Sequence, residues 1–127
     1  MLRKILILIT TIFMLTNWVS AWYSSFYYWH CTWYVAKEKK VTWRWNAKDW
    51  LVNASNQWYS IWNKARYKSI VVFYWPWYNQ DYWHTAIVEN VIWDYIIISE
   101  MNYYRLWQIT YRKISKSDIN ILWYIYV

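Results

Sequence analysis

A thiol, an imidazole and a carboxylate are the side chains of this 127-residue chain that could together carry out nucleophilic catalysis. Cys31 is the only cysteine, and it opens a segment without helix breakers, 31–39, that we expect to form a helix. Backbone N–H groups at a helix N-terminus favour a thiolate and lower the pKa of the thiol. Position 31 therefore suits a cysteine nucleophile, although a buried, inert cysteine would fit the start of a helix equally well.

A second part of the chain offers a base together with a group to orient it. Alternating side chains predict strands at 84–91 and 95–101, joined by a tight turn. In that hairpin His84 lies level with Glu100 and Asn102, and opposed side chains of paired strands have Cβ atoms about 5 Å apart. The imidazole would then reach a carboxylate or an amide. The alternative is that His84 and Glu100 are separate, solvated strand residues.

The elements that must position these groups form a helical half followed by a half rich in strands. A second helix is expected at 47–54, with Asn46 as its N-cap. The strands are expected at 69–74, 84–91, 95–101, 109–114 and 121–127. Helices first and antiparallel strands later predict one α+β domain, with the N-terminal helices packed on the sheet.

The composition is basic, rich in tryptophan and devoid of glycine. A net charge of +7 favours an anionic partner, which could be nucleic acid, a membrane surface or an acidic wall polymer. The chain has 15 Trp and no Gly, yet a folded domain needs Gly wherever the backbone takes a positive φ. We hypothesise that many of these tryptophans are UGA codons, which one genetic code reads as Trp and another as Gly.

The tryptophans at turn-like positions are the ones expected to be glycine in the natural protein. They are Trp29, Trp45, Trp58, Trp62, Trp75, Trp77, Trp83, Trp93, Trp107 and Trp123. Trp33, Trp43 and Trp50 stand in helix-like or packed contexts and are expected to be genuine. The alternative is a protein that is truly rich in Trp and free of Gly.

The first 21 residues have the pattern of a secretory signal peptide. Arg3 and Lys4 form a basic start, residues 5–15 form an apolar core, and 19–21 supply small residues before a cleavage site after Ala21. The apolar core is about half of the roughly 20 residues that span a bilayer, so a retained membrane anchor is the alternative. We therefore expect a secreted or wall-associated protein.

Four segments resemble the motifs of the CHAP family, the cysteine- and histidine-dependent amidohydrolases/peptidases, once the proposed glycines are restored. Segment 29–36 resembles the nucleophile motif of that family, and 43–50 resembles its W-x-G-N-A-x-x-W segment. Segment 82–89 is similar to its Y-G-H-x-A-x-V strand, and 98–103 to its x-S-E-x-N-x strand. The motifs follow the order of the family, so the resemblance implies a CHAP domain at 22–127, after the signal peptide expected at 1–21.

The resemblance implies a papain-like fold and cleavage of an amide bond in peptidoglycan. The bond is either the N-acetylmuramoyl-L-alanine linkage or one within the stem peptide or cross-bridge. Carried over by position, Cys31 is the nucleophile, His84 the base and acid, and Glu100 the residue that orients the imidazole, with Asn102 in support. The family often has Gln before the nucleophile as an oxyanion donor, and His30 stands there in this chain.

Three other interpretations lead to different expectations. A zinc site from His30, Cys31, His84 and Glu100 lacks the usual ligand spacing, so no metal or cofactor is expected. Nucleic-acid binding conflicts with an export signal, and the basic residues, Arg112 among them, are expected to form a solvated face. A non-catalytic wall-binding module of the same fold remains the alternative to a hydrolase. We expect a monomer that contacts the membrane only through an uncleaved signal segment.

Overall fold

A computed structural model describes residues 31–43, 46–74, 83–101, 103 and 107–127. Within these ranges, two α-helices and a short 3₁₀ helix precede six strands. The helical elements are α2 (Cys31–Lys39), η1 (Ala47–Asp49) and α3 (Trp50–Asn56). The strands are β1 (Ser60–Trp62), β2 (Ile70–Tyr74), β3 (Trp83–Ile92), β4 (Tyr95–Met101), β5 (Ile109–Ser115) and β6 (Ile121–Tyr126). Within the described ranges, none of the helices has the length and apolar character that a bilayer span requires.

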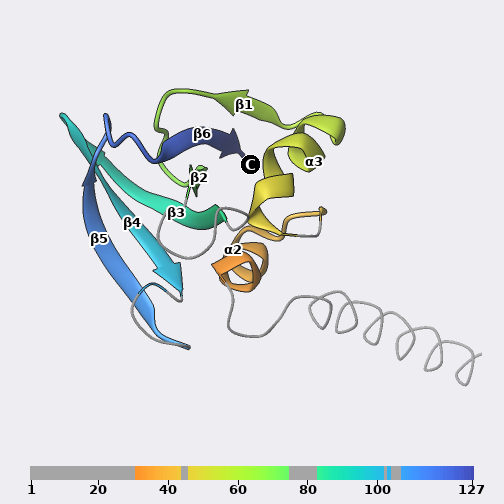
Figure 1. Cartoon of the computed structure of the whole chain (residues 1–127), viewed down its shortest axis with the longest axis horizontal. Helices are drawn as coiled ribbons and strands as arrows, with labels where there is room; N and C mark the ends of the chain where they lie inside the picture. Colours follow the sequence, from red (N-terminus) through yellow and green to blue (C-terminus); the bar gives the residue numbers. More distant parts are fainter. Residues whose placement is uncertain (1–30, 44–45, 75–82, 102, 104–106) are drawn as a thin grey trace, which may run out of the picture.

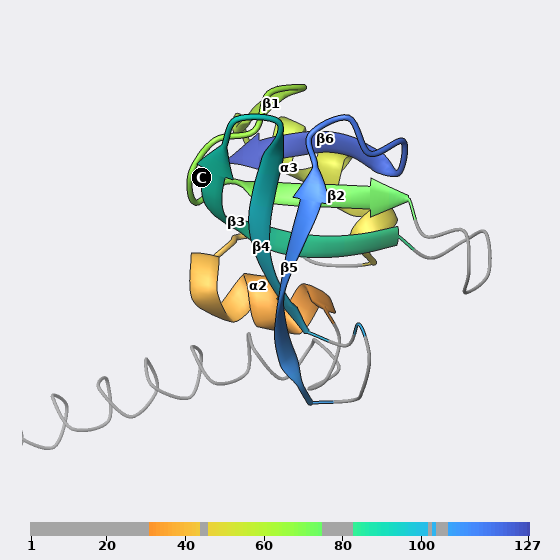
Figure 2. The ribbon, with the colours of Figure 1, turned by 90° about the vertical axis from the view of Figure 1, so that its left-hand side faces the viewer.

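The strands form one antiparallel sheet in the order β1-β6-β2-β3-β4-β5. Figure 1 shows α2 and α3 on the same side of this sheet, with β5 at the opposite side of the molecule. Turned by 90°, β4 and β5 run steeply across β2 and β3, so the sheet is strongly twisted (Figure 2). The predicted α+β architecture, with N-terminal helices packed on an antiparallel sheet, is therefore confirmed.

The two faces of the sheet bury two separate apolar clusters, one of which holds the helices. Val35 of α2 and Trp50 of α3 pack with sheet residues that include Ile70 and Ile87. A second cluster lies on the other face of the sheet, where its residues alternate along the strands with those of the first cluster. Its members are Val71, Phe73, Ala86, Val88, Ile96, Ile98, Ile114 and Tyr124. Each strand in the middle of the sheet thus presents buried side chains on both faces, which fixes its register.

The predicted elements are largely confirmed, and the differences are local. The helix at 31–39 has the expected bounds, whereas the helix expected at 47–54 is divided into η1 and α3, which ends at Asn56. Asn46 precedes η1 as expected, but its side chain makes no capping hydrogen bond; its carbonyl accepts one from the Asp49 N–H at 2.9 Å. The three-residue strand β1 was not predicted, because it is too short to show alternation.

Three tryptophans adopt a backbone conformation that glycine normally takes. Trp58, Trp93 and Trp107 have φ values of 69°, 45° and 71°, a region that is costly for any residue with a Cβ atom. Their side chains are 95%, 88% and 58% exposed, so burial offsets little of that cost. All three belong to the set that the sequence assigns to glycine, and their geometry supports that hypothesis.

Trp58 occupies the position of a helix C-terminal motif at which glycine is most strongly preferred. The Tyr59 N–H donates to the Ala54 carbonyl at 3.1 Å, and the Trp58 N–H donates to the Ser55 carbonyl at 3.0 Å. With Gln57 as the C-cap of α3, these two bonds define a Schellman motif, whose C′ residue is usually Gly in the left-handed conformation. Trp58 is that C′ residue.

Trp93 stands in the two-residue turn of the β3–β4 hairpin, where Ile92 pairs with Tyr95. A positive φ at the first central residue of such a turn also favours glycine. Trp43 and Trp50 behave differently, since they are 2% and 0% exposed and their rings meet edge-on with centroids 5.7 Å apart. This is the packing expected of genuine tryptophans.

Candidate active site

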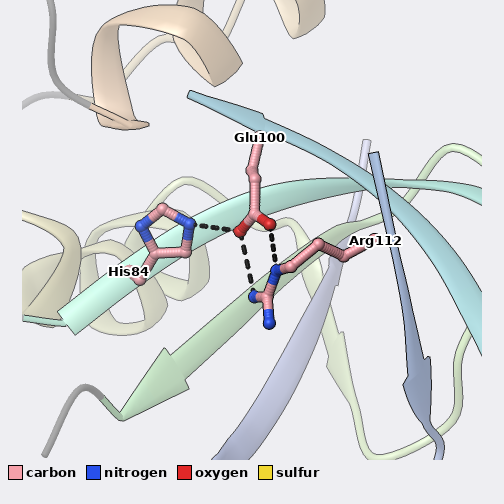
Figure 3. A network of polar contacts seen from close by, with 3 residues as sticks. All are labelled: His84, Glu100 and Arg112. Carbon is pink, nitrogen blue, oxygen red and sulfur yellow. Dashed lines mark hydrogen bonds and ion pairs between the residues drawn. The ribbon is translucent and has the colours of Figure 1, made fainter. Parts of the chain in front are cut away.

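The β3–β4 hairpin brings an imidazole and a carboxylate together on one face of the sheet. The register of the hairpin pairs Ile87 with Ser99, which places His84 and Glu100 on the same face near the end of β4. The His84 Nε2 and Glu100 Oε2 atoms lie 2.6 Å apart (Figure 3). His84 is 5% exposed and Glu100 is fully buried. The predicted contact between them is confirmed, and the solvated alternative is excluded.

The carboxylate of Glu100 has a second partner that the sequence did not reveal. Arg112 of β5 donates from Nε to Glu100 Oε1 and from Nη2 to Oε2, the latter at 3.1 Å (Figure 3). Its side chain is only 22% exposed, so the expectation that Arg112 belongs to a solvated basic face is wrong. The physical reason is parity, since Arg112 lies two residues from the buried Ile114 on the same face of β5.

Cys31 reaches this pair from the N-terminus of α2. The charge and side chain of His84 and the backbone of Thr85 act on the thiol of Cys31, and each of them lowers its pKa. Strand β3 pairs with β2 along Trp83–Ile87 but with β4 only from Ile87 onward. The backbone of β3 beside His84 is therefore available to α2, which packs against both β3 and β4.

The electrostatics of the cluster favour a thiolate beside an imidazolium. Burial raises the pKa of the Cys31 thiol, but the positive charge of His84 and the hydrogen bonds of His84 and Thr85 lower it by more. The net result is a pKa below the usual 9.0. Burial lowers the pKa of His84, whereas Cys31 and Glu100 raise it from 6.5 to about 9. Each group thus stabilises the charged form of the other.

Glu100 remains ionised although it is fully buried. Burial alone would raise the pKa of its carboxyl group, but hydrogen bonds and charges from His84 and Arg112 hold that pKa below the usual 4.5. A buried carboxylate is stable only when it is paired and hydrogen-bonded. Here both of its oxygens accept from charged donors.

A polar network fixes α2 on the sheet next to the cluster. The Tyr34 hydroxyl of α2 donates to Ser99 Oγ at 2.8 Å, and Ser99 Oγ donates to Glu89 Oε1 at 2.6 Å. The other oxygen of Glu89 pairs with Lys68. A helix of nine residues is too short to be stable by itself, and this network ties the helix that carries Cys31 to both β3 and β4.

Two residues of the predicted site, His30 and Asn102, lie outside the described residues, as does the predicted signal peptide at 1–21. Their proposed roles remain predictions. Among the residues that the structure describes, no three His, Cys, Asp or Glu side chains form a cluster that could hold a metal ion.

Comparison with known proteins places this geometry in a family. The model of the CHAP domain family matches residues 22–102. An N-acetylmuramoyl-L-alanine amidase from Staphylococcus aureus is similar in structure, with a TM-score of 0.62 and 30% identity over 76% of this chain. The structure of Ly7917 is similar with a TM-score of 0.49 and 23% identity over 67% of this chain. No curated protein sequence matches significantly.

The matches cover only part of the solved structures, since the aligned region is 30% of the amidase chain and 39% of the Ly7917 chain. The family model, by contrast, matches most of the present chain. It includes the helix that carries Cys31, the strand that carries His84 and the strand that carries Glu100. The chain belongs to the CHAP domain family.

Proposed function

We propose that this protein is a cysteine hydrolase that cleaves an amide bond in peptidoglycan, with Cys31 as nucleophile and His84 as general base and acid. The observation that supports it most is the buried His84–Glu100 contact of 2.6 Å beside the only sulfur nucleophile of the chain. The similar S. aureus protein is an N-acetylmuramoyl-L-alanine amidase, and the basic charge of this chain suits an anionic wall polymer. Residues 1–21 would direct export.

The reaction begins with the thiolate of Cys31. The sulfur attacks the amide carbon, a C–S bond forms, and the carbonyl electron pair moves onto oxygen to give a tetrahedral oxyanion. The oxyanion collapses, the C–N bond breaks, and the imidazolium gives its proton to the departing amine. Because Nε2 of His84 donates to Glu100, Nδ1 is the ring nitrogen that exchanges this proton.

The second half of the reaction releases the acyl group. Water attacks the thioester carbon while Nδ1 of His84 takes a proton from the water. The C–S bond then breaks as the second tetrahedral intermediate collapses. The products are a carboxylic acid and the restored thiolate–imidazolium pair. The buried carboxylate of Glu100 keeps the imidazole in one orientation through both proton transfers.

The negative charge on oxygen needs donors during both steps. The Cys31 backbone N–H lies at the N-terminus of α2, where N–H groups point outward and the helix dipole favours negative charge. His30, which precedes the nucleophile, would supply the second donor through its ring N–H. Asn102 would support His84 next to Glu100.

Mass spectrometry of fragments from purified peptidoglycan tests the proposal and identifies the bond. An amidase releases intact stem peptides that begin with a free L-alanine amine, whereas an endopeptidase leaves shortened stems on the sugar. The His84→Ala variant should release neither. Wall binding without new fragments from the unmodified protein would instead support the non-catalytic wall-binding module.

A further inference from the structure

We propose that Arg112 is a positioning residue of the active site, which holds Glu100 ionised and in one rotamer so that Glu100 can orient His84. The inference rests on the proposed hydrolase function and adds to it a fourth side chain from β5. Arg112 donates to both oxygens of Glu100, and we infer that it acts on His84 through this carboxylate.

The geometry of the contact is that of a fork rather than a single bond. Nε donates to one oxygen of Glu100 and Nη2 to the other, at 3.1 Å for the second. Two parallel N–H donors fix the plane of a carboxylate as well as its position. The Oε2 atom that accepts from Nη2 also accepts from His84 at 2.6 Å, so its direction toward the imidazole depends on the plane that Arg112 sets.

Arg112 is itself held in place by its surroundings. Its guanidinium carbon lies 3.7 Å from the centroid of the Tyr103 ring, and its side chain is only 22% exposed. A planar guanidinium stacked on a ring has little freedom to turn. In the sheet, Arg112 pairs with Ile98 and Glu100 pairs with Thr110, so the contact runs diagonally between neighbouring strands.

Charge balance gives a second reason for the role. Glu100 is fully buried and faces His84 from β3 and Arg112 from β5, with Cys31 of α2 beyond the imidazole. Two cationic groups therefore share one carboxylate. Without Arg112 the carboxylate would keep only His84 as a charged partner, and protonation of Glu100 would become easier as the pH falls. A protonated Glu100 cannot stabilise the imidazolium.

The exposed neighbour Lys113 provides a matched control. It lies on the same strand, carries the same charge, and stacks over Tyr95 at 3.8 Å rather than contacting Glu100. Arg112→Met and Lys113→Met thus remove one positive charge each, but only the first should alter the active site. Arg112→Lys keeps the charge and loses the fork.

The experiment measures peptidoglycan hydrolysis by the full-length protein and its variants across pH. Arg112→Met should lower kcat roughly ten- to a hundredfold, the factor that corresponds to one hydrogen bond to a buried charge. KM should change little, and the acid limb of the rate profile should move to higher pH. Arg112→Lys should recover part of kcat, and Lys113→Met should match the unmodified protein within about twofold.

A second readout needs no wall substrate. Iodoacetamide alkylates the only thiol of the chain, so its rate against pH reports the thiolate of Cys31 alone. The rate at neutral pH should fall in Arg112→Met and to a lesser extent in Arg112→Lys. If Arg112→Met does not fold, Arg112→Lys still tests the proposal, because it retains the positive charge and loses only the two-pronged contact.

The failures of the two proposals can be told apart. If Cys31→Ala hydrolyses peptidoglycan as fast as the unmodified protein, the proposed function fails whatever Arg112 does. If Cys31→Ala is inactive while both Arg112 variants keep unmodified kcat, pH profile and alkylation rate, only the role of Arg112 is overturned.

Discussion

The pKa of His84 is the property through which the whole cluster can be perturbed. The imidazole is buried, which lowers its pKa, yet Cys31 and Glu100 raise that pKa from 6.5 to about 9. At 1.36 kcal/mol per pH unit, this rise corresponds to about 3 kcal/mol of preference for the imidazolium. Removing either negative partner should therefore lower the pKa by an amount that NMR resolves easily.

Glu100→Gln removes the negative charge with little change in shape. An opposite charge at such a distance typically changes a pKa by about 1 to 3, so we expect the pKa of His84 to fall by at least about 1. The uncompensated guanidinium of Arg112 acts in the same direction. Cys31→Ala should lower the pKa as well, and the double variant should titrate below 6.5, because both burial and the positive charge of Arg112 then disfavour the imidazolium.

The assay is NMR titration of the histidine ring carbons and protons. The chain has two histidines, so a His30→Gln variant assigns both signals. Glu89→Gln serves as the control, since Glu89 contacts Ser99 and Lys68 rather than His84 and its loss should leave the pKa of His84 unchanged. The reasoning is refuted if His84 of the unmodified protein titrates at or below 6.5, or if neither active-site variant changes its pKa.

Three further predictions concern catalysis, stability and the identity of the tryptophans. The pH–rate profile should be bell-shaped, with an alkaline limb near pH 9 where His84 loses its proton; an alkaline limb near 6.5 would contradict the thiolate–imidazolium pair. Arg112→Met should lower the free energy of unfolding by about 3 kcal/mol at pH 7, and denaturant titrations should show the difference shrinking below pH 4.5. The reason is that Arg112 helps to hold the pKa of Glu100 below 4.5 in the folded protein. The ionised Glu100 therefore stabilises the fold above pH 4.5, and this contribution is lost as its carboxylate is protonated at lower pH. Trp58→Gly should raise stability by about 1 kcal/mol because it relieves a positive φ, whereas Trp50→Gly should cost more than about 4 kcal/mol in the core. Calorimetry compares the two, and the intact mass of the natural product tests whether glycine stands at position 58 already.

The hairpin that carries the base could be predicted from the sequence because strand periodicity is local. His84 and Glu100 have the parity of the buried residues on their strands, and a two-residue turn fixes which residues lie opposite one another. A bulge between Val88 and Asn90 displaces the register, yet it leaves the two side chains on one face. Strand pairing alone therefore predicts their contact.

The approach of Cys31 to His84 could not be predicted from spacing. It depends on how α2 packs against β3 and β4, which involves buried side chains such as Tyr34 and Ser99 that are far apart in the sequence. The motifs of the family supplied this link instead. Arg112 was missed for a related reason, since a basic residue on an edge strand is usually solvated, and only the position of Glu100 on the neighbouring strand makes it a partner.

Glycine-dependent turns were the part of the fold least visible in the printed sequence. Trp58 and Trp93 stand at a helix C-terminus and in a hairpin turn, where a glycine would have predicted both features directly. The surrounding pattern of apolar residues still located the elements, because burial rather than turn chemistry decides where strands and helices pack.

The rate at which Cys31→Ala releases fragments from purified peptidoglycan tests the account most directly. The variant removes one sulfur atom from a partly buried site, so its fold should survive and its circular dichroism should match that of the unmodified protein. We predict that the unmodified protein releases amide-cleaved fragments and that the variant releases none above the uncatalysed background. Equal rates for the two proteins would show that the sulfur is not the nucleophile.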